Sequence, residues 1–114
     1  MQVENQTRGQ SLIIHGEVAE TFWTRFRGLM GRSPLKEGEG LVLKGEKSIH
    51  TFFMRFAIDV VYADRTGRVI RADTAMSPNR IGPIVLGAAY VLEMPMGAIQ
   101  ASGTAVGDQL LIRT

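Results

Sequence analysis

The stretch AIDVVYADRTGRVIRAD, residues 57–73, carries the strongest structural signal in the chain. Residues 57–63 are an apolar run rich in β-branched side chains, which favour strands. Residues 68–73 alternate apolar and charged side chains, the pattern of a strand with one face in water. The four residues between them, Asp-Arg-Thr-Gly, end in glycine as a hairpin turn does. The stretch therefore predicts a β-hairpin.

Similar short runs on both sides of this hairpin extend the prediction to a sheet. The 114 residues include 13 glycines, which are spread along the chain and therefore punctuate short elements rather than long helices. We predict further strands at residues 11–18, 40–43, 50–55, 90–94 and 109–113.

Two segments favour helix instead. Residues 19–29 carry apolar side chains at the spacing of one helical face, which we expect to be buried, and residues 97–102 could form a single helical turn. The predicted fold class is thus α+β, mainly β: a compact curved sheet or small barrel of short strands with one or two short helices. We expect residues 1–10 to be a flexible N-terminal end and residues 11–114 a single globular domain.

Composition excludes several classes of protein. The chain has no cysteine, so disulfide scaffolds, thiolate metal sites and cysteine nucleophiles are ruled out. A formal net charge of +2 gives no indication of nucleic-acid binding. No apolar run approaches the roughly 20 residues that cross a membrane. The polar N-terminus lacks the core of a signal peptide, which predicts a cytoplasmic protein, or an exported one if a leader has been removed.

Two carboxylates interrupt apolar strands. Asp59 lies in the first strand of the hairpin and Glu93 in the run YVLEM, residues 90–94. A buried carboxylate without a partner costs several kcal/mol or stays protonated, so each needs a stabilising environment. One reading is structural: an ion pair, with Arg55 or Arg80 as candidates, or backbone hydrogen bonds at a turn. The other is a carboxyl group in a pocket with a perturbed pKa.

His50 lies in the run SIHTFFMR, where it would share one strand face with Phe52 and Met54. It could be a satisfied core residue, or its imidazole could meet Asp59 across a tight connection. Together with Glu93 the two would supply the ligand types of a metal site, although no local motif gives the required spacing. A copper site of His50 with methionines is a weaker alternative, because methionine commonly fills cores.

Arginines gather around the end of the expected helix. Arg25, Arg27 and Arg32 stand near Trp23 and could hold an anion or stacked bases. They could equally form a solvated helix end that complements the helix dipole. Walker, dinucleotide-binding and serine-nucleophile motifs are absent from the sequence.

Several segments together resemble a known family. They are RGLMGR (27–32), GLVL (40–43), IHTFFM (49–54), IDVVY (58–62) and YVLEM (90–94), followed by Gly97, Gly103, Gly107 and Asp108. In this order they resemble the bacterial and archaeal domain-of-unknown-function family 192, over about residues 13–112. Many relatives have tryptophan where this chain has Phe53. The resemblance implies a compact, mainly β domain without an assigned activity, in some relatives with an N-terminal signal or anchor. It directs attention to His50, Thr51, Met54, Asp59 and Glu93 as candidate binding residues.

The sequence favours a non-enzymatic ligand-binding or accessory module with a pocket near His50 and Asp59. One alternative is a metal-assisted or hydrolase-like enzyme that uses His50, Asp59 and Glu93. Another is anion or nucleic-acid binding through Arg25, Arg27 and Arg32. We expect no cofactor, and a small molecule or a protein as partner.

Overall fold

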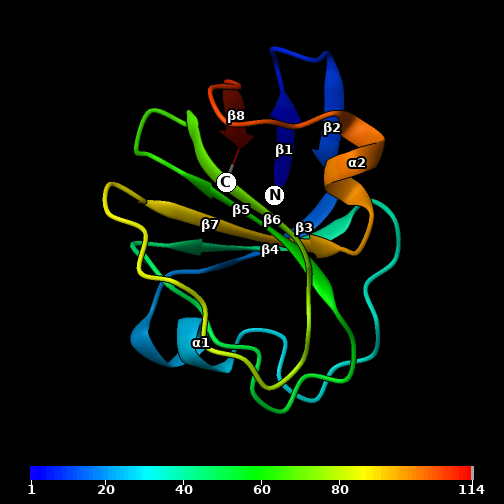
Figure 1. Cartoon of the computed structure of the whole chain (residues 1–114), viewed down its shortest axis with the longest axis vertical. Coiled ribbons are helices and arrows are strands. Elements are labelled where there is room, and N and C mark those ends of the chain that lie inside the picture. The colour runs from blue at the N-terminus through cyan, green and yellow to red at the C-terminus, as the bar shows by residue number, and fades with distance from the viewer. Residues whose placement is uncertain (114) are drawn as a thin grey trace.

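A five-stranded sheet is the centre of the computed structural model, which describes residues 1–113 (Figure 1). Its strand order is β3-β4-β7-β5-β6, with β3 parallel to β4 and every other pair antiparallel. The strands are β3 (His15–Ala19), β4 (Glu39–Lys44), β5 (Ile58–Ala63), β6 (Val69–Met76) and β7 (Tyr90–Pro95). The sheet stays open, with β3 and β6 as its edges. The predicted α+β, mainly β fold class is therefore confirmed, as an open sheet and not as a barrel.

The predicted hairpin is confirmed as β5 and β6. In the turn, the Gly67 amide donates to the carbonyl of Asp64, whose side chain accepts from the amides of Thr66 and Arg68. The return strand runs to Met76, three residues beyond the predicted end at Asp73.

A second sheet of order β2-β1-β8 covers one face of the first, formed by β1 (Gln2–Asn5), β2 (Gln10–Ile13) and β8 (Leu110–Arg113). The N-terminal segment, where the sequence predicted a frayed end, is here the central strand β1. Val3 and Asn5 point inward and are completely buried, while Gln2 and Glu4 alternate outward. The strand pattern is hidden in the sequence because one inward position is polar. Asn5 is accommodated because its side-chain amide donates to Thr104 Oγ1 and Asp108 Oδ2, both at 3.0 Å.

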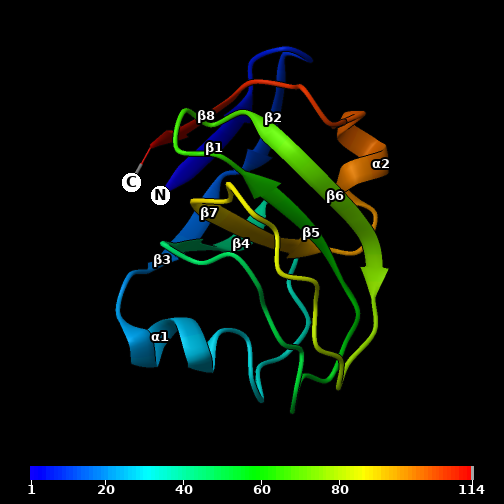
Figure 2. The same ribbon diagram turned by 60° about the vertical axis from the view of Figure 1, so that its left-hand side comes forward.

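The five-stranded sheet has a hydrophobic cluster on each face. Val61 of β5 and Leu92 of β7 face the second sheet and α2 (Ala98–Ser102). Val60 of β5 and Val91 of β7 face the opposite side, toward α1 (Phe22–Arg27) and the loops around it (Figure 2). Successive strand residues alternate between the two faces. The face that a side chain occupies therefore decides which surroundings it meets.

Two predicted strands need correction. The strand predicted at residues 11–18 is two strands, β2 and β3, in different sheets. The strand predicted at residues 50–55 is a loop, held by one isolated bridge between His50 and Ile81. The Phe53 backbone is left-handed (φ 61°), which interrupts the extended conformation in this segment.

The predicted helix at residues 19–29 is real but shorter, and its apolar face is not buried. A capping box between Thr21 and Thr24 starts α1, and Gly28 ends it. No side chain of α1 is buried: Phe22 is 76% and Trp23 65% exposed. By contrast, the helical turn predicted at residues 97–102 is confirmed as α2, between two left-handed glycines. Neither helix in the described residues is long and apolar enough to cross a membrane.

Candidate functional site

Asp59 is a structural residue that closes the end of the sheet on the side of α2. It is fully buried, and its Oδ1 accepts from the Ala75 amide at 2.9 Å. Its Oδ2 accepts from the amides of Gly97 at 3.1 Å and Ile99 at 2.9 Å, at the start of α2. Of the two readings of this carboxylate, the structure supports the one with backbone hydrogen bonds at a turn. The partners are amides rather than Arg55 or Arg80.

Glu93 is buried without such partners. It is 2% exposed, and its Oε2 has no hydrogen-bond partner within residues 1–113. Burial raises the pKa of the Glu93 carboxyl to about 8, although the positive charge of Arg32 acts in the opposite direction. The neutral acid is therefore the main form at neutral pH. Glu93 corresponds to the other reading of a buried carboxylate, a group with a perturbed pKa in a pocket.

Glu93 lines a cleft of about 310 Å³ under α1, which we name the Glu93 cleft. Most of its wall is apolar, and charged or polar groups are few. Its lining residues are Phe22, Arg25, Phe26, Gly28, Glu46, Ser48, Ile49, His50, Phe52, Ile81 and Glu93. A largely apolar concavity with a few convergent polar groups is the usual form of a small-molecule site.

His50 contributes a ring to this cleft rather than a free nitrogen. Its Nε2 lies 2.7 Å from the Phe26 carbonyl oxygen, and its Nδ1 accepts from the Phe52 amide at 3.2 Å. These two contacts assign the proton of the neutral ring to Nε2. The imidazole lies between the rings of Phe26 and Phe52, at centroid distances of 5.0 and 5.3 Å. Both nitrogens are thus engaged by backbone groups. Phe26 belongs to α1 and also contacts Phe22 and Trp23 of that helix, so the row of neighbouring rings extends from His50 along α1.

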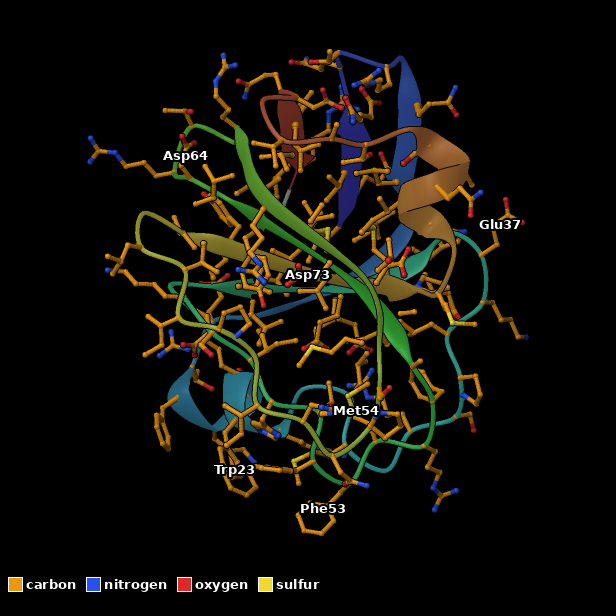
Figure 3. The ribbon with its side chains drawn as sticks, viewed as in Figure 1. Trp23, Glu37, Phe53, Met54, Asp64 and Asp73 are labelled. Atoms are coloured by element: carbon orange, nitrogen blue, oxygen red, sulfur yellow. The ribbon has the colours of Figure 1, made fainter. Side chains whose placement is uncertain are left out.

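Thr51 and Met54 do not line the Glu93 cleft but support its wall. Thr51 Oγ1 donates to the Ser77 carbonyl at 2.7 Å and accepts from the Arg80 amide at 2.8 Å. Met54 is buried in the hydrophobic cluster on the same side of the sheet as Glu93. Figure 3 shows Met54 in the interior, with Phe53 and Trp23 at the outer surface near α1.

The arginines singled out in the sequence do not form one anion site. Arg32 pairs with Glu17 at 2.8 Å. Arg25 donates from Nη1 to the carbonyls of Glu20 and Lys44, both at 3.0 Å. Only Arg25 of the three lines the Glu93 cleft. Its Nε is 3.5 Å from Glu46 Oε2, an ion-pair distance, but has no hydrogen-bond partner within the described residues.

The alternative of a metal-assisted site built from His50, Asp59 and Glu93 is wrong, because these side chains do not converge. Asp59 is paired in register with Met94, and Val60 with Glu93. The pleat therefore directs Asp59 to the side of α2, while Glu93 and His50 lie on the side of α1. Among residues 1–113, no three histidine or acidic side chains are grouped so that they could hold a metal ion.

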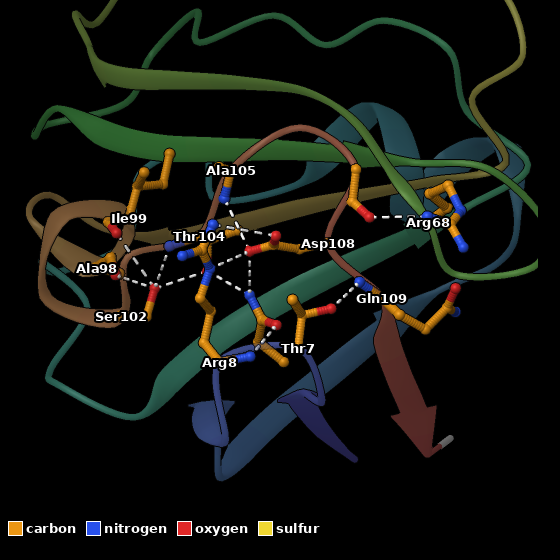
Figure 4. A network of polar contacts seen from close by, with 12 residues as sticks. Thr7, Arg8, Arg68, Ala98, Ile99, Ser102, Thr104, Ala105, Asp108 and Gln109 are labelled. Carbon is orange, nitrogen blue, oxygen red and sulfur yellow. Dashed lines mark hydrogen bonds and ion pairs between the residues drawn. The ribbon is translucent and has the colours of Figure 1, made fainter.

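A polar network at the other end of the molecule explains the role of Asp108, which follows Gly107 in the chain (Figure 4). Asp108 accepts from Asn5, from Arg8 Nε at 2.9 Å and from the Ala105 amide at 3.0 Å. The hydrogen bond from Arg8 is the largest cause that lowers the pKa of Asp108 to about 2. This network joins the two ends of the chain and is structural.

Sequence reasoning missed the cleft-lining roles of Arg25, Phe22 and Phe26. The available signal is the aromatic stripe of α1, whose spacing predicts a buried face. A short helix with three aromatic residues and a capping box is equally suited to form the rim of a cleft, and the sequence alone does not distinguish these roles.

Comparisons with known proteins agree with this fold. A protein of unknown function from Novosphingobium aromaticivorans has a crystal structure that superposes with a TM-score of 0.86, at 21% identity, over 98% of this chain and 84% of that one. At that identity the similarity shows the fold alone.

Sequence relatives assign the family. The UPF0127 protein of Thermococcus gammatolerans is 40% identical to this chain over an aligned region that spans 91% of this chain and 70% of that protein. The UPF0127 protein of Pyrococcus furiosus is 36% identical and covers 93% of both chains. Residues 3–112 match the DUF192 family, described as Uncharacterized ACR, COG1430. The chain belongs to this family, the domain-of-unknown-function family 192.

Proposed function

We propose that the protein is a small-molecule-binding domain whose ligand occupies the Glu93 cleft. The observation that carries this proposal is the Glu93 carboxyl, buried in an apolar wall and left without a hydrogen-bond partner. A buried polar group without a partner costs about 1–3 kcal/mol and therefore calls for an explanation, and a ligand that completes the group supplies one.

The proposal is one of binding rather than catalysis, because Glu93 is left without the second acid or base that the three-residue alternative requires. A general base needs a nitrogen or oxygen that can reach the substrate. Both ring nitrogens of His50 are engaged by backbone groups, and Asp59 is engaged by three amides on the far side of the sheet. Thr51 and Met54 support the site by fixing the 50–54 loop and the cluster beneath it.

Ligand-detected and protein-detected NMR with a set of small apolar and aromatic fragments tests the proposal. We expect binding fragments to shift the amide resonances of Phe26, His50 and Phe52. Ile81 and Ile84 offer a matched pair of variants, because both side chains are 75% exposed but only Ile81 lines the cleft. Ile81→Glu should abolish fragment binding, and Ile84→Glu should leave it unchanged. Fragments that shift only resonances outside the cleft, or bind both variants equally, would contradict the proposal.

A further inference from the structure

The end of the molecule that α1 occupies, opposite the second sheet, exposes a group of large apolar side chains (Figure 1 and Figure 2). We name this surface the aromatic end and define it by six exposed residues: Phe22, Trp23, Phe26, Phe52, Phe53 and Ile81. Figure 3 shows Trp23 and Phe53 at the outer limit of this end. None of the elements described above covers these side chains, so they face water.

Contacts between neighbouring segments make the aromatic end one surface. Within α1, Phe22 and Trp23 lie against Phe26, at ring-centroid distances of 6.4 and 6.2 Å. Trp23, Phe26 and Phe53 line one apolar hollow of about 350 Å³. The Phe53 amide donates to Asn79 Oδ1 at 3.1 Å, which holds the loop against its neighbour. A contiguous apolar surface on a folded domain marks a site of interaction.

The charges at this end are of one sign. The segments that form it, residues 21–35, 48–57 and 77–83, contain five of the 13 lysines and arginines and none of the 11 acids. The rest of the chain therefore carries eight basic residues against 11 acidic ones. Although the net charge is only +2, the molecule is polarised, with its positive side at the aromatic end.

Three of these five basic residues have no countercharge. Arg27, Arg55 and Arg80 are exposed and form no ion pair within residues 1–113. Arg27 lines the apolar hollow together with Trp23. Glu37, which follows the first of the three segments, lies well away from Trp23 (Figure 3). The aromatic end thus combines exposed rings with unpaired positive charge.

We propose that the aromatic end docks on the surface of a bilayer that contains anionic lipids. Tryptophan and phenylalanine side chains are stabilised at the boundary between headgroups and acyl chains. Arginine side chains beside them are attracted by the negative surface potential of anionic lipids. This inference concerns attachment to one face of a membrane and goes beyond the proposed function.

A lipid surface fits these features better than a protein or a nucleic acid. A protein partner would need acidic groups at three fixed positions around an apolar centre, whereas anionic headgroups move laterally to each arginine. The fully buried core of a protein interface is also depleted in charge. A single-stranded nucleic acid stacks on aromatic rings, but Ile81 is 75% exposed and offers no ring.

Vesicle co-sedimentation with the unsubstituted protein tests the proposal. One set of vesicles contains phosphatidylcholine alone, and the other contains phosphatidylcholine and phosphatidylglycerol in equal parts. We expect binding to the mixed vesicles only, weakened by added salt because salt screens the arginines. Emission of Trp23, the single tryptophan, should shift to shorter wavelength on the mixed vesicles, because its ring is 65% exposed to water in the free protein.

Phe53 and Val106 offer a matched pair of apolar variants. Their side chains are 72% and 65% exposed, and Val106 lies near Asp108 at the other end of the molecule. Asparagine tolerates the left-handed backbone of Phe53 (φ 61°), so Phe53→Asn keeps the fold. We expect Phe53→Asn to weaken binding to the mixed vesicles by at least about tenfold. Val106→Asn should leave it unchanged.

Arg27 and Arg65 form the corresponding pair of basic variants. Both are exposed and without an ion pair in the described part of the chain, but Arg65 belongs to the turn of the β5–β6 hairpin. Arg27→Gln should weaken binding to the mixed vesicles about fivefold, the usual contribution of one basic side chain near an anionic membrane. Arg65→Gln should not weaken it. Arg27 and Phe53 do not line the Glu93 cleft, so these variants leave the proposed ligand site intact.

Several results overturn the proposal. The first is no binding to either kind of vesicle, or equal binding to both. The second is equal binding by Phe53→Asn and Val106→Asn. Light scattering without lipid that shows a dimer, lost in Phe53→Asn, would assign the surface to a second copy of this chain. Tighter binding to an oligothymidine than to the mixed vesicles would assign it to a single-stranded nucleic acid.

Discussion

Asp59 and Glu93 lie one register position apart on neighbouring strands and point to opposite faces of the same sheet. Asp59 receives three backbone amides, whereas Glu93 Oε2 receives no hydrogen bond within the described residues. The two carboxyl groups therefore differ in role although their sequence surroundings are alike. The first fixes the fold, and the second is free to meet a ligand.

Replacing Asp59 should destabilise the protein. Asp59→Ala leaves the amides of Ala75, Gly97 and Ile99 without their acceptor. The loss costs about 1–3 kcal/mol for the buried Ile99 amide and less for the two that are partly buried. We expect a loss on the order of 3 kcal/mol or more in the free energy of unfolding, measured by urea denaturation. Asp73→Ala is the control, because Asp73 pairs with Arg71 at the surface and should change stability by less than about 1 kcal/mol. Equal effects of the two variants would contradict the structural role of Asp59.

The pH dependence of stability should reveal Glu93. Its folded-state pKa of about 8 lies above the ordinary value of 4.5, so the folded protein retains a proton that the unfolded chain has lost. The stabilisation is complete below about pH 4.5 and is lost as pH rises to about 8, with a slope of at most about 1.4 kcal/mol per pH unit.

Glu93→Gln removes this dependence. The variant should be more stable than the unsubstituted protein at neutral pH, by on the order of 3 kcal/mol, and the difference should vanish near pH 4.5. Denaturation between about pH 5 and about pH 8 isolates the effect, because the lowered pKa values of Asp64 and Asp108 act at more acid pH. Parallel stability curves for the two proteins over this interval would refute the assignment.

The sequence predicts those parts of the fold that depend on local pattern. The β5–β6 hairpin and α2 follow from apolar runs bounded by turn residues and glycines, whose signals are complete within a few residues. Strand β1 could not be predicted, because the polar side chain of Asn5 can be buried only where Asp108 accepts its hydrogen bond. Asp108 lies 103 residues further along the chain. The same limit applies to the site. The face of the sheet on which Glu93 lies depends on pairing between strands that are distant in sequence. The same pairing decides whether a backbone amide can reach its carboxyl group.

The exposed face of α1 gives a stability prediction of its own. Leu29 follows the helix and is buried, whereas Phe22 within it is 76% exposed. Leu29→Ala should cost about 2–5 kcal/mol in the free energy of unfolding because it opens a cavity, and Phe22→Ala less than about 1 kcal/mol. Urea denaturation of both variants measures the difference. A large loss for Phe22→Ala would indicate that this aromatic residue packs into a core after all.

Gly67 joins the hairpin turn to β8, and its substitution tests that junction against a matched control. Gly67 and Gly107 have similar left-handed conformations, with φ 88° and 94°, so alanine is strained at both. A Cβ at Gly67 would also collide with the carbonyl oxygen of Leu110, whereas a Cβ at Gly107 would meet open space. The shared strain costs about 1–2 kcal/mol in each variant. The collision should add about 1–3 kcal/mol to Gly67→Ala alone, because the Leu110 amide donates to the Gly67 carbonyl at 2.8 Å and holds β8 against the turn. Equal losses in the free energy of unfolding would mean that β8 moves away without cost and that the junction between the sheets is looser than these contacts imply.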